Sequence, residues 1–192
     1  SADSHVMEPP DLWWNALGER FGERTPRLME EWRGESGRFF YTGGQVRRLM
    51  DIEKDAESRD ALEDGYVPEK RVAFQRNAGV AAEIMYTSAM LAQLRSPDAE
   101  VLQAAAAVYN DWLYDFCAYD SERLVAIAVV PMHDPAWAVR EFDRNLARGF
   151  RGAMINLGAP AGRSAYRDPS YDPFWARAAE AGAPITLHSG SG

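Results

Sequence analysis

Residues 124–157 read LVAIAVVPMHDPAWAVREFDRNLARGFRGAMINL, and this stretch decides the predicted fold. Two short, continuous apolar runs, at 124–130 and 152–157, flank a segment that opens with Asp134-Pro135. Short apolar runs without alternation are typical of buried parallel strands, and Asp-Pro is a common start of a helix. The stretch therefore predicts a strand–helix–strand unit of an α/β fold.

The same pattern continues on both sides of this unit. Further strands are predicted at 3–7, 82–87 and 184–187, which makes five in all. Helices are predicted to start at Ser96-Pro97-Asp98, Asp134 and Asp172, and to end near Tyr119, Gly149 and Gly182. Ser96, Asp134 and Asp172 are separated by 38 positions each, a period typical of a repeated supersecondary unit. Equal spacing by chance is the alternative, and the alternation of strand and helix holds in either case.

Residues 14–65 interrupt the series as a long insertion after the first strand. They are rich in Arg, Glu, Gly and aromatic residues, and they include Gly43-Gly44 and a charged run at 51–64. This composition predicts an irregular excursion with short helical pieces, and a long insertion of this kind often serves as a lid or an interface. A helix over 71–77, introduced by Pro68, is predicted to follow it.

Five strand–helix units in series fit two architectures. One is an open, doubly wound parallel sheet, and the other is the first part of a (β/α)8 TIM barrel. Nucleotide binding by a doubly wound sheet needs a glycine-rich turn, and the segment 158–162, GAPAG, has neither the GxGxxG nor the Walker form. The barrel is therefore favoured, with this chain supplying about its first five strands.

Composition narrows the class of protein. The chain has 192 residues, of which 46% are apolar, which excludes intrinsic disorder. No apolar run approaches the roughly 18 residues of a membrane span, and the N-terminus does not have the pattern of a signal peptide. The formal net charge of -8 argues against nucleic-acid binding. A single cysteine, Cys117, fits a reducing compartment, so we expect a cytoplasmic protein whose partner is a small molecule.

Histidines at strand ends carry the main functional signal. Asp3 and His5 lie two residues apart on the first predicted strand and therefore share a face. His188 follows the fifth strand. Because the carboxyl ends of parallel strands open on one side, Asp3, His5 and His188 can converge there and bind a divalent cation. The alternative is that the two histidines are buried strand-end residues with backbone partners.

Three more polar residues lie near the same strand ends. Glu8 precedes Pro9-Pro10 and is predicted to contact the substrate or to support the metal site from behind its ligands. Asn156 ends an apolar strand, so it either caps a loop or meets the substrate. His133 can line the same end or serve in the loop that caps the next helix. Cys117 has no basic neighbour and is predicted to be a core residue.

Two motifs resemble a known family. Residues 3–13, DSHVMEPPDLW, and residues 171–175 with 183–190, YDPFW and APITLHSG, are similar to the amidohydrolase-related (amidohydrolase 2) family. This family contains metal-dependent TIM-barrel hydrolases and decarboxylases, among them aminocarboxymuconate-semialdehyde decarboxylase. The resemblance implies that residues 1–192 are the N-terminal part of one barrel domain.

The resemblance also implies a metal site and a reaction class. It assigns one divalent ion to Asp3, His5 and His188, with Zn²⁺ expected first and Mn²⁺, Fe²⁺ or Mg²⁺ as alternatives. Asp3 stands where the family often has His or Glu. A histidine after the sixth strand, an aspartate after the eighth and the acid/base residues are expected beyond Gly192.

The resemblance implies three functional readings. The first is a hydrolase of a small carboxylated or cyclic substrate, and the second is a non-oxidative decarboxylase that uses the same metal site. The third belongs to another class: a catalytically incomplete fragment or subunit that needs the missing C-terminal half. A homodimer is expected by analogy, with the aromatic segment 13–41 as its contact or as a lid.

Overall fold

A computed structural model describes residues 1–48, 65–160 and 162–188. Its helices are α1 (Leu12–Phe21), α3 (Pro68–Asn77), α4 (Met90–Gln93), α5 (Ala99–Ala118), α6 (Pro135–Ala147) and α7 (Asp172–Ala181), with short 3-10 helices at Gly22–Arg24 and Pro169–Tyr171. The strands of the parallel series are β1 (Ser4–His5), β5 (Glu83–Tyr86), β6 (Leu124–Ala126), β7 (Ala128–Val129), β8 (Ala153–Ile155) and β9 (Ile185–Leu187). The predicted charged run at 51–64 lies outside the described residues.

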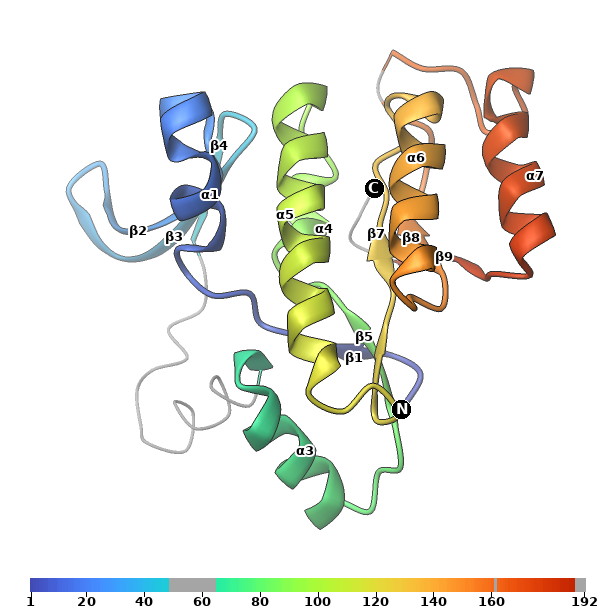
Figure 1. Cartoon of the computed structure of the whole chain (residues 1–192). Helices are drawn as coiled ribbons and strands as arrows, with labels where there is room; N and C mark the ends of the chain where they lie inside the picture. The colour runs from blue at the N-terminus through green and yellow to red at the C-terminus, as the bar shows by residue number, and fades with distance from the viewer. Residues whose placement is uncertain (49–64, 161, 189–192) are drawn as a thin grey trace.

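The parallel strands follow one another in chain order. β1 pairs with β5 and β5 with β6, while β7 pairs with β8 and β8 with β9, all in parallel. β6 and β7 are two halves of the strand predicted at 124–130, separated by Ile127. In Figure 1, helices α5, α6 and α7 stand side by side along the strands. The predicted α/β series of five strands is therefore present, with its third strand divided.

The insertion after the first strand is the main correction to the predicted fold. Instead of an irregular excursion, residues 27–48 form a three-stranded antiparallel sheet of β2 (Arg27–Trp32), β3 (Glu35–Thr42) and β4 (Gln45–Arg48). Both hairpins turn on two residues with positive φ, Arg33-Gly34 and Gly43-Gly44. This is the backbone conformation that two-residue hairpin turns require.

One of the three predicted helix starts differs from the prediction. The carboxylate of Asp134 caps α6 as predicted, by accepting from the backbone N–H groups of Ala136 and Trp137. Helix α5 is capped by Asp98 rather than by Ser96, whereas α7 begins at Asp172 as predicted, directly after the cap residue Tyr171. The strict period of 38 residues is therefore not reproduced by the observed caps.

The core lies between the parallel strands and the helices that pack on them. Trp13 of α1 is buried, and its indole N–H donates to the carbonyl of Ala105 in α5, so part of the aromatic segment 13–41 belongs to the core. Cys117 is buried on α5, and burial raises the pKa of its thiol to about 12. This confirms the core position predicted for Cys117. Among the described residues, no helix combines the length and apolar character needed to cross a bilayer.

One close approach fixes the last strand of the series. A Cβ atom added at Gly152 would lie 2.4 Å from the carbonyl oxygen of Pro184, just before β9. We therefore expect Gly152→Ala to destabilise the protein by about 1–3 kcal/mol, measured as a lower midpoint in urea. Gly158→Ala is the matched control, because its Cβ would meet nothing within 4 Å. Equal midpoints for the two variants would contradict this explanation.

Candidate metal centre

Three side chains predicted to bind a metal meet at one point. His5 Nε2 lies 3.1 Å from His188 Nε2, Asp3 Oδ1 lies 3.5 Å from His5 Nε2, and Asp3 Oδ1 lies 3.3 Å from His188 Nε2. Asp3 precedes β1, His5 ends β1, and His188 directly follows β9. Residues 183 positions apart in the sequence therefore contribute to one cluster.

This convergence requires a strongly curved sheet. β1 and β9 are the first and last strands of the series, and four strand spacings of about 4.8 Å would hold them about 19 Å apart in a flat sheet. Their imidazole nitrogens are nevertheless 3.1 Å apart. The strands therefore curve around a common axis, as in a barrel, and bring their carboxyl ends to a shared mouth.

The spacing of the three atoms fits a shared cation. Two donor atoms at about 2.1 Å from one ion lie about 3.0 Å apart at a right angle and about 3.4 Å apart in a tetrahedron. The observed separations of 3.1 to 3.5 Å agree with these values to within about 0.1 Å. Two imidazole nitrogens and a carboxylate oxygen suit Zn²⁺, Mn²⁺ or Fe²⁺. The cluster is half open to solvent, since the side chain of Asp3 is 69% exposed and that of His188 is 18% exposed.

The ring of His5 is oriented by the backbone. Its Nδ1 lies 2.7 Å from the carbonyl oxygen of Thr87, which can only accept, so Nδ1 carries the proton and Nε2 presents a lone pair to the cluster. The carbonyl of His5 accepts from Arg71, and Arg71 also forms a buried ion pair with Glu83 of β5. The ring of His188 meets that of His5 edge to face. Both the tautomer and the position of His5 are therefore fixed.

Glu8 is buried beside this arrangement rather than within the cluster. Its carboxylate accepts from the hydroxyl of Thr87 and from the backbone N–H groups of Ser88 and Ala89. Burial raises the pKa of Glu8, and the hydrogen bonds from Thr87 and from the backbone partly offset that rise. Glu8 therefore contacts the loop that supplies the Thr87 carbonyl.

Asn156 joins three loops at the carboxyl ends of the strands. Its side-chain oxygen accepts from the N–H of Met132 at 3.1 Å, and its side-chain nitrogen donates to the carbonyl of Leu94 at 2.8 Å. Its own carbonyl accepts from the hydroxyl of Tyr166. Both polar atoms of the Asn156 side chain are thus bound to backbone, which fits the predicted loop cap better than a substrate contact.

His133 lies outside the cluster. It is 7% exposed, and its Nδ1 has no hydrogen-bond partner among the described residues. Burial, and next the positive charge of Arg163, lower the pKa of His133.

Sequence reasoning missed Thr87, although a polar Thr87-Ser88 pair directly after the apolar strand is the kind of signal that marks a strand end.

Comparison with known families gives a match over most of the chain. Residues 5–192 match a family model described as "Amidohydrolase". A gamma-resorcylate decarboxylase from Polaromonas sp. is 30% identical over 137 residues, which are 69% of this chain and 41% of that protein. A gamma-resorcylate decarboxylase from Rhizobium radiobacter is 33% identical over 97 residues, 48% of this chain and 30% of that protein. The chain thus spans less than half the length of the curated relatives it matches.

Solved structures agree on the fold. An amidohydrolase from Mycobacterium avium subsp. paratuberculosis superposes with a TM-score of 0.79 at 21% identity, covering 98% of this chain and 57% of that one. A dihydroxybenzoic acid decarboxylase from Polaromonas sp. JS666, with bound manganese and 2-nitroresorcinol, gives 0.65 at 19% identity, covering 98% and 48%. These likenesses confirm the prediction that the chain supplies about the first five strands of a TIM barrel.

Proposed function

Because this chain belongs to the amidohydrolase family, we propose that it is part of a metal-dependent decarboxylase acting on a small aromatic carboxylic acid. The convergence of Asp3, His5 and His188 within 3.5 Å carries the proposal. The choice of reaction is supported by the curated relatives, since the gamma-resorcylate enzymes and a relative from Emericella nidulans are named as decarboxylases. These names reverse the order of our first two expectations, in which hydrolysis preceded decarboxylation.

Asp3, His5 and His188 would hold the divalent ion. An ion bound there polarises a carboxylate or hydroxyl oxygen of the substrate and lowers the pKa of bound water. The donor set accepts Zn²⁺ and Mn²⁺ alike. Zn²⁺ was expected first, whereas similar solved structures are described with bound manganese. We therefore include Mn²⁺ as the first ion to test.

In this proposal the described residues hold and orient the metal ligands and the loops around them, and they do not transfer protons. His5 keeps its proton on Nδ1, toward the Thr87 carbonyl, and so offers its second nitrogen to the ion. Asp3, largely exposed, supplies a negative charge at the mouth that lowers the net charge of a bound cation. Asn156 holds the loops around Met132 and Leu94 in place. The acid/base residues, the homodimer and the reading as an incomplete fragment stay predictions.

Decarboxylation yields a defined pair of products. The carboxylate carbon leaves as CO₂ and the ring carbon takes up a proton. In the complete protein we expect 2,6-dihydroxybenzoate or a related hydroxybenzoate to release CO₂ with Mn²⁺ present. Removing the ion with a chelator should lower the rate by at least about 100-fold, since the ion supplies several kcal/mol of charge stabilisation.

The control for this assay is a panel of cyclic amides and lactones, which a hydrolase would open without forming CO₂. Metal-dependent hydrolysis of that panel, with no CO₂ from any hydroxybenzoate, would contradict the decarboxylase proposal. The proposed metal site would still be consistent with that result, because the hydrolysis would also depend on the metal.

A further inference from the structure

A buried carboxylate accepts hydrogen bonds from the loop that follows β5. Glu8 is 8% exposed, and one of its oxygens accepts from the hydroxyl of Thr87 and from the N–H of Ser88 at 3.1 Å. Its other oxygen accepts from the N–H of Ala89 at 3.0 Å. Three consecutive residues of the loop are therefore bound by a single side chain from the segment that follows β1.

Thr87 connects this loop to the metal cluster. Its hydroxyl donates to Glu8 and accepts from the N–H of Met90 at 2.9 Å, so the side chain is fixed from two sides. Its carbonyl accepts the Nδ1 proton of His5 at 2.7 Å. A residue that is held at its hydroxyl has little freedom to turn its carbonyl, so the contact with His5 depends on the contact with Glu8.

A second side-chain hydrogen bond also joins the loop after β5 to the segment after β1. The hydroxyl of Ser88 donates to the carbonyl of Val6 at 2.7 Å, in the segment between His5 and Glu8. Hydrogen bonds of two side chains, Glu8 and Ser88, thus connect the loop after β5 to the residues that follow β1. The Pro9-Pro10 pair after Glu8 restricts the backbone there and keeps the carboxylate in place.

From these contacts we infer that Glu8 is a positioning residue for the metal site: through Thr87 it orients His5 for metal binding. This inference rests on the proposed function and adds a role for a residue that lies outside the cluster of Asp3, His5 and His188. A carboxylate is required because three donors converge on it. A glutamine would turn its amide N–H₂ toward a donor and leave at least one buried N–H or hydroxyl unsatisfied.

The test is Glu8→Gln in the complete protein. We expect the affinity for Mn²⁺, measured by EPR titration, to fall about 10- to 100-fold, as when an outer partner of a metal-binding histidine is lost. Glu141→Gln is the matched control, because Glu141 is also a buried glutamate in a hydrogen-bond network but lies on α6. That control should keep the parental affinity even if its melting temperature falls.

A metal-free readout separates this inference from the proposed function. Long-range ¹H–¹⁵N spectra report the tautomer of His5, which we expect to be Nδ1–H in the parent and a mixture of tautomers in Glu8→Gln. A parent that binds no Mn²⁺ would overturn the proposed function, whereas the tautomer comparison would still decide the role of Glu8. Unchanged tautomer and unchanged Mn²⁺ affinity in a folded Glu8→Gln variant would overturn the positioning role.

A second pair of variants covers the case in which Glu8→Gln does not fold. Thr87→Val removes the hydroxyl and keeps the carbonyl, while Thr87→Ser keeps both. We expect weakened Mn²⁺ binding in Thr87→Val and near-parental binding in Thr87→Ser. Equal affinities in these two variants would overturn the inference, because the hydroxyl would then have no part in orienting His5.

Discussion

Replacing His188 by alanine is expected to remove the metal from the protein. His188 supplies one of three atoms that lie within 3.5 Å of one another, and among the described residues it is the only one near β9 that contributes to that cluster. The loss should exceed the roughly 10- to 100-fold typical of an outer partner, so that the variant retains little metal after dialysis. Metal content by plasma mass spectrometry and CO₂ release from 2,6-dihydroxybenzoate should fall together.

The control for this experiment is the third histidine. His133→Ala removes a buried imidazole that lies outside the cluster, so it should lower stability while leaving the metal content near that of the parent. Equal metal contents in His188→Ala and the parent would show that the cluster is not the binding site. Loss of metal in both variants would point to general unfolding, which circular dichroism would detect.

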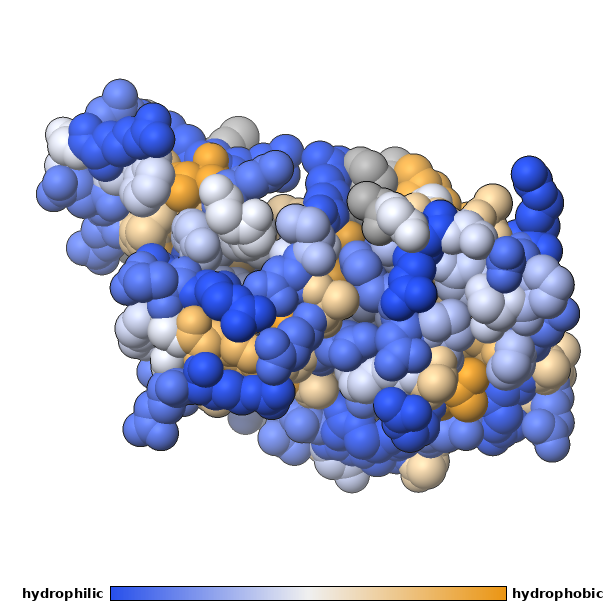
Figure 2. All heavy atoms as spheres, turned by 90° about the horizontal axis from the view of Figure 1, so that it is seen from above, coloured by the Kyte–Doolittle hydropathy of each residue, from blue (hydrophilic) through white to orange (hydrophobic). Residues whose placement is uncertain are grey.

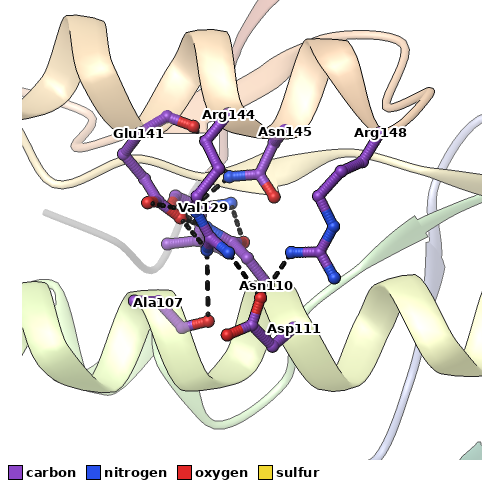
Figure 3. A network of polar contacts seen from close by, with 8 residues as sticks. All are labelled: Ala107, Asn110, Asp111, Val129, Glu141, Arg144, Asn145 and Arg148. Carbon is purple, nitrogen blue, oxygen red and sulfur yellow. Dashed lines mark hydrogen bonds and ion pairs between the residues drawn. The ribbon is translucent and has the colours of Figure 1, made fainter.

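Among the substitutions considered, replacing Asn110 by alanine is expected to lower the free energy of unfolding the most. Asn110 is fully buried on α5, and its amide accepts from the N–H of Val129 at 2.8 Å and donates to the carbonyl of Val129 at 3.0 Å. It also donates to the buried Glu141 at 2.8 Å. Figure 3 shows these contacts between α5, α6 and the strand.

The position of Val129 explains why this contact matters. Its neighbours Ala128 and Val130 donate to the carbonyls of Gly152, just before β8, and Met154, in β8. The N–H and carbonyl of Val129 therefore face away from β8, on the side where the pairing of β6 with β5 has already ended. Asn110 replaces the missing strand partner there. Asn110→Ala leaves both backbone groups buried without a partner, at about 1–3 kcal/mol each. We therefore expect a loss of about 2–6 kcal/mol in the free energy of unfolding, measured in urea.

The neighbouring residue provides a matched control. Asp111 pairs with Arg144 and Arg148 in the same network, but its side chain is 54% exposed. Exposed ion pairs contribute little, so Asp111→Ala should cost at most about 1 kcal/mol. Similar losses for Asn110→Ala and Asp111→Ala would refute the idea that Asn110 completes the strand.

The parallel part of the fold could be predicted from the sequence because its central strands, such as β7 and β8, are fully buried. Runs such as 124–130 and 152–157 are continuously apolar for that reason, and Asp134 marks a helix start by its capping chemistry. The antiparallel sheet was missed because its strands carry charged residues among the apolar ones. Arg27 lies 4.6 Å from the ring centre of Tyr41, so a cationic side chain covers an aromatic one where the composition predicted an irregular excursion.

The site was predictable to the extent that strand ends share one side of the sheet. Asp3, His5 and His188 could be placed together on that ground, and Glu8 near them. The contact between Thr87 and His5 could not be predicted, because it uses a backbone carbonyl that every residue possesses. The predicted dimer contact is untested. On the face seen in Figure 2, apolar side chains form small groups among hydrophilic ones.

The most direct test of the metal centre is a crystal of the complete protein grown with Mn²⁺ and measured for anomalous scattering at the manganese edge. The geometry predicts one strong peak at about 2.1–2.2 Å from His5 Nε2, His188 Nε2 and an Asp3 carboxylate oxygen. Absence of a peak between these three side chains, or a peak bound by other residues, would contradict the assignment.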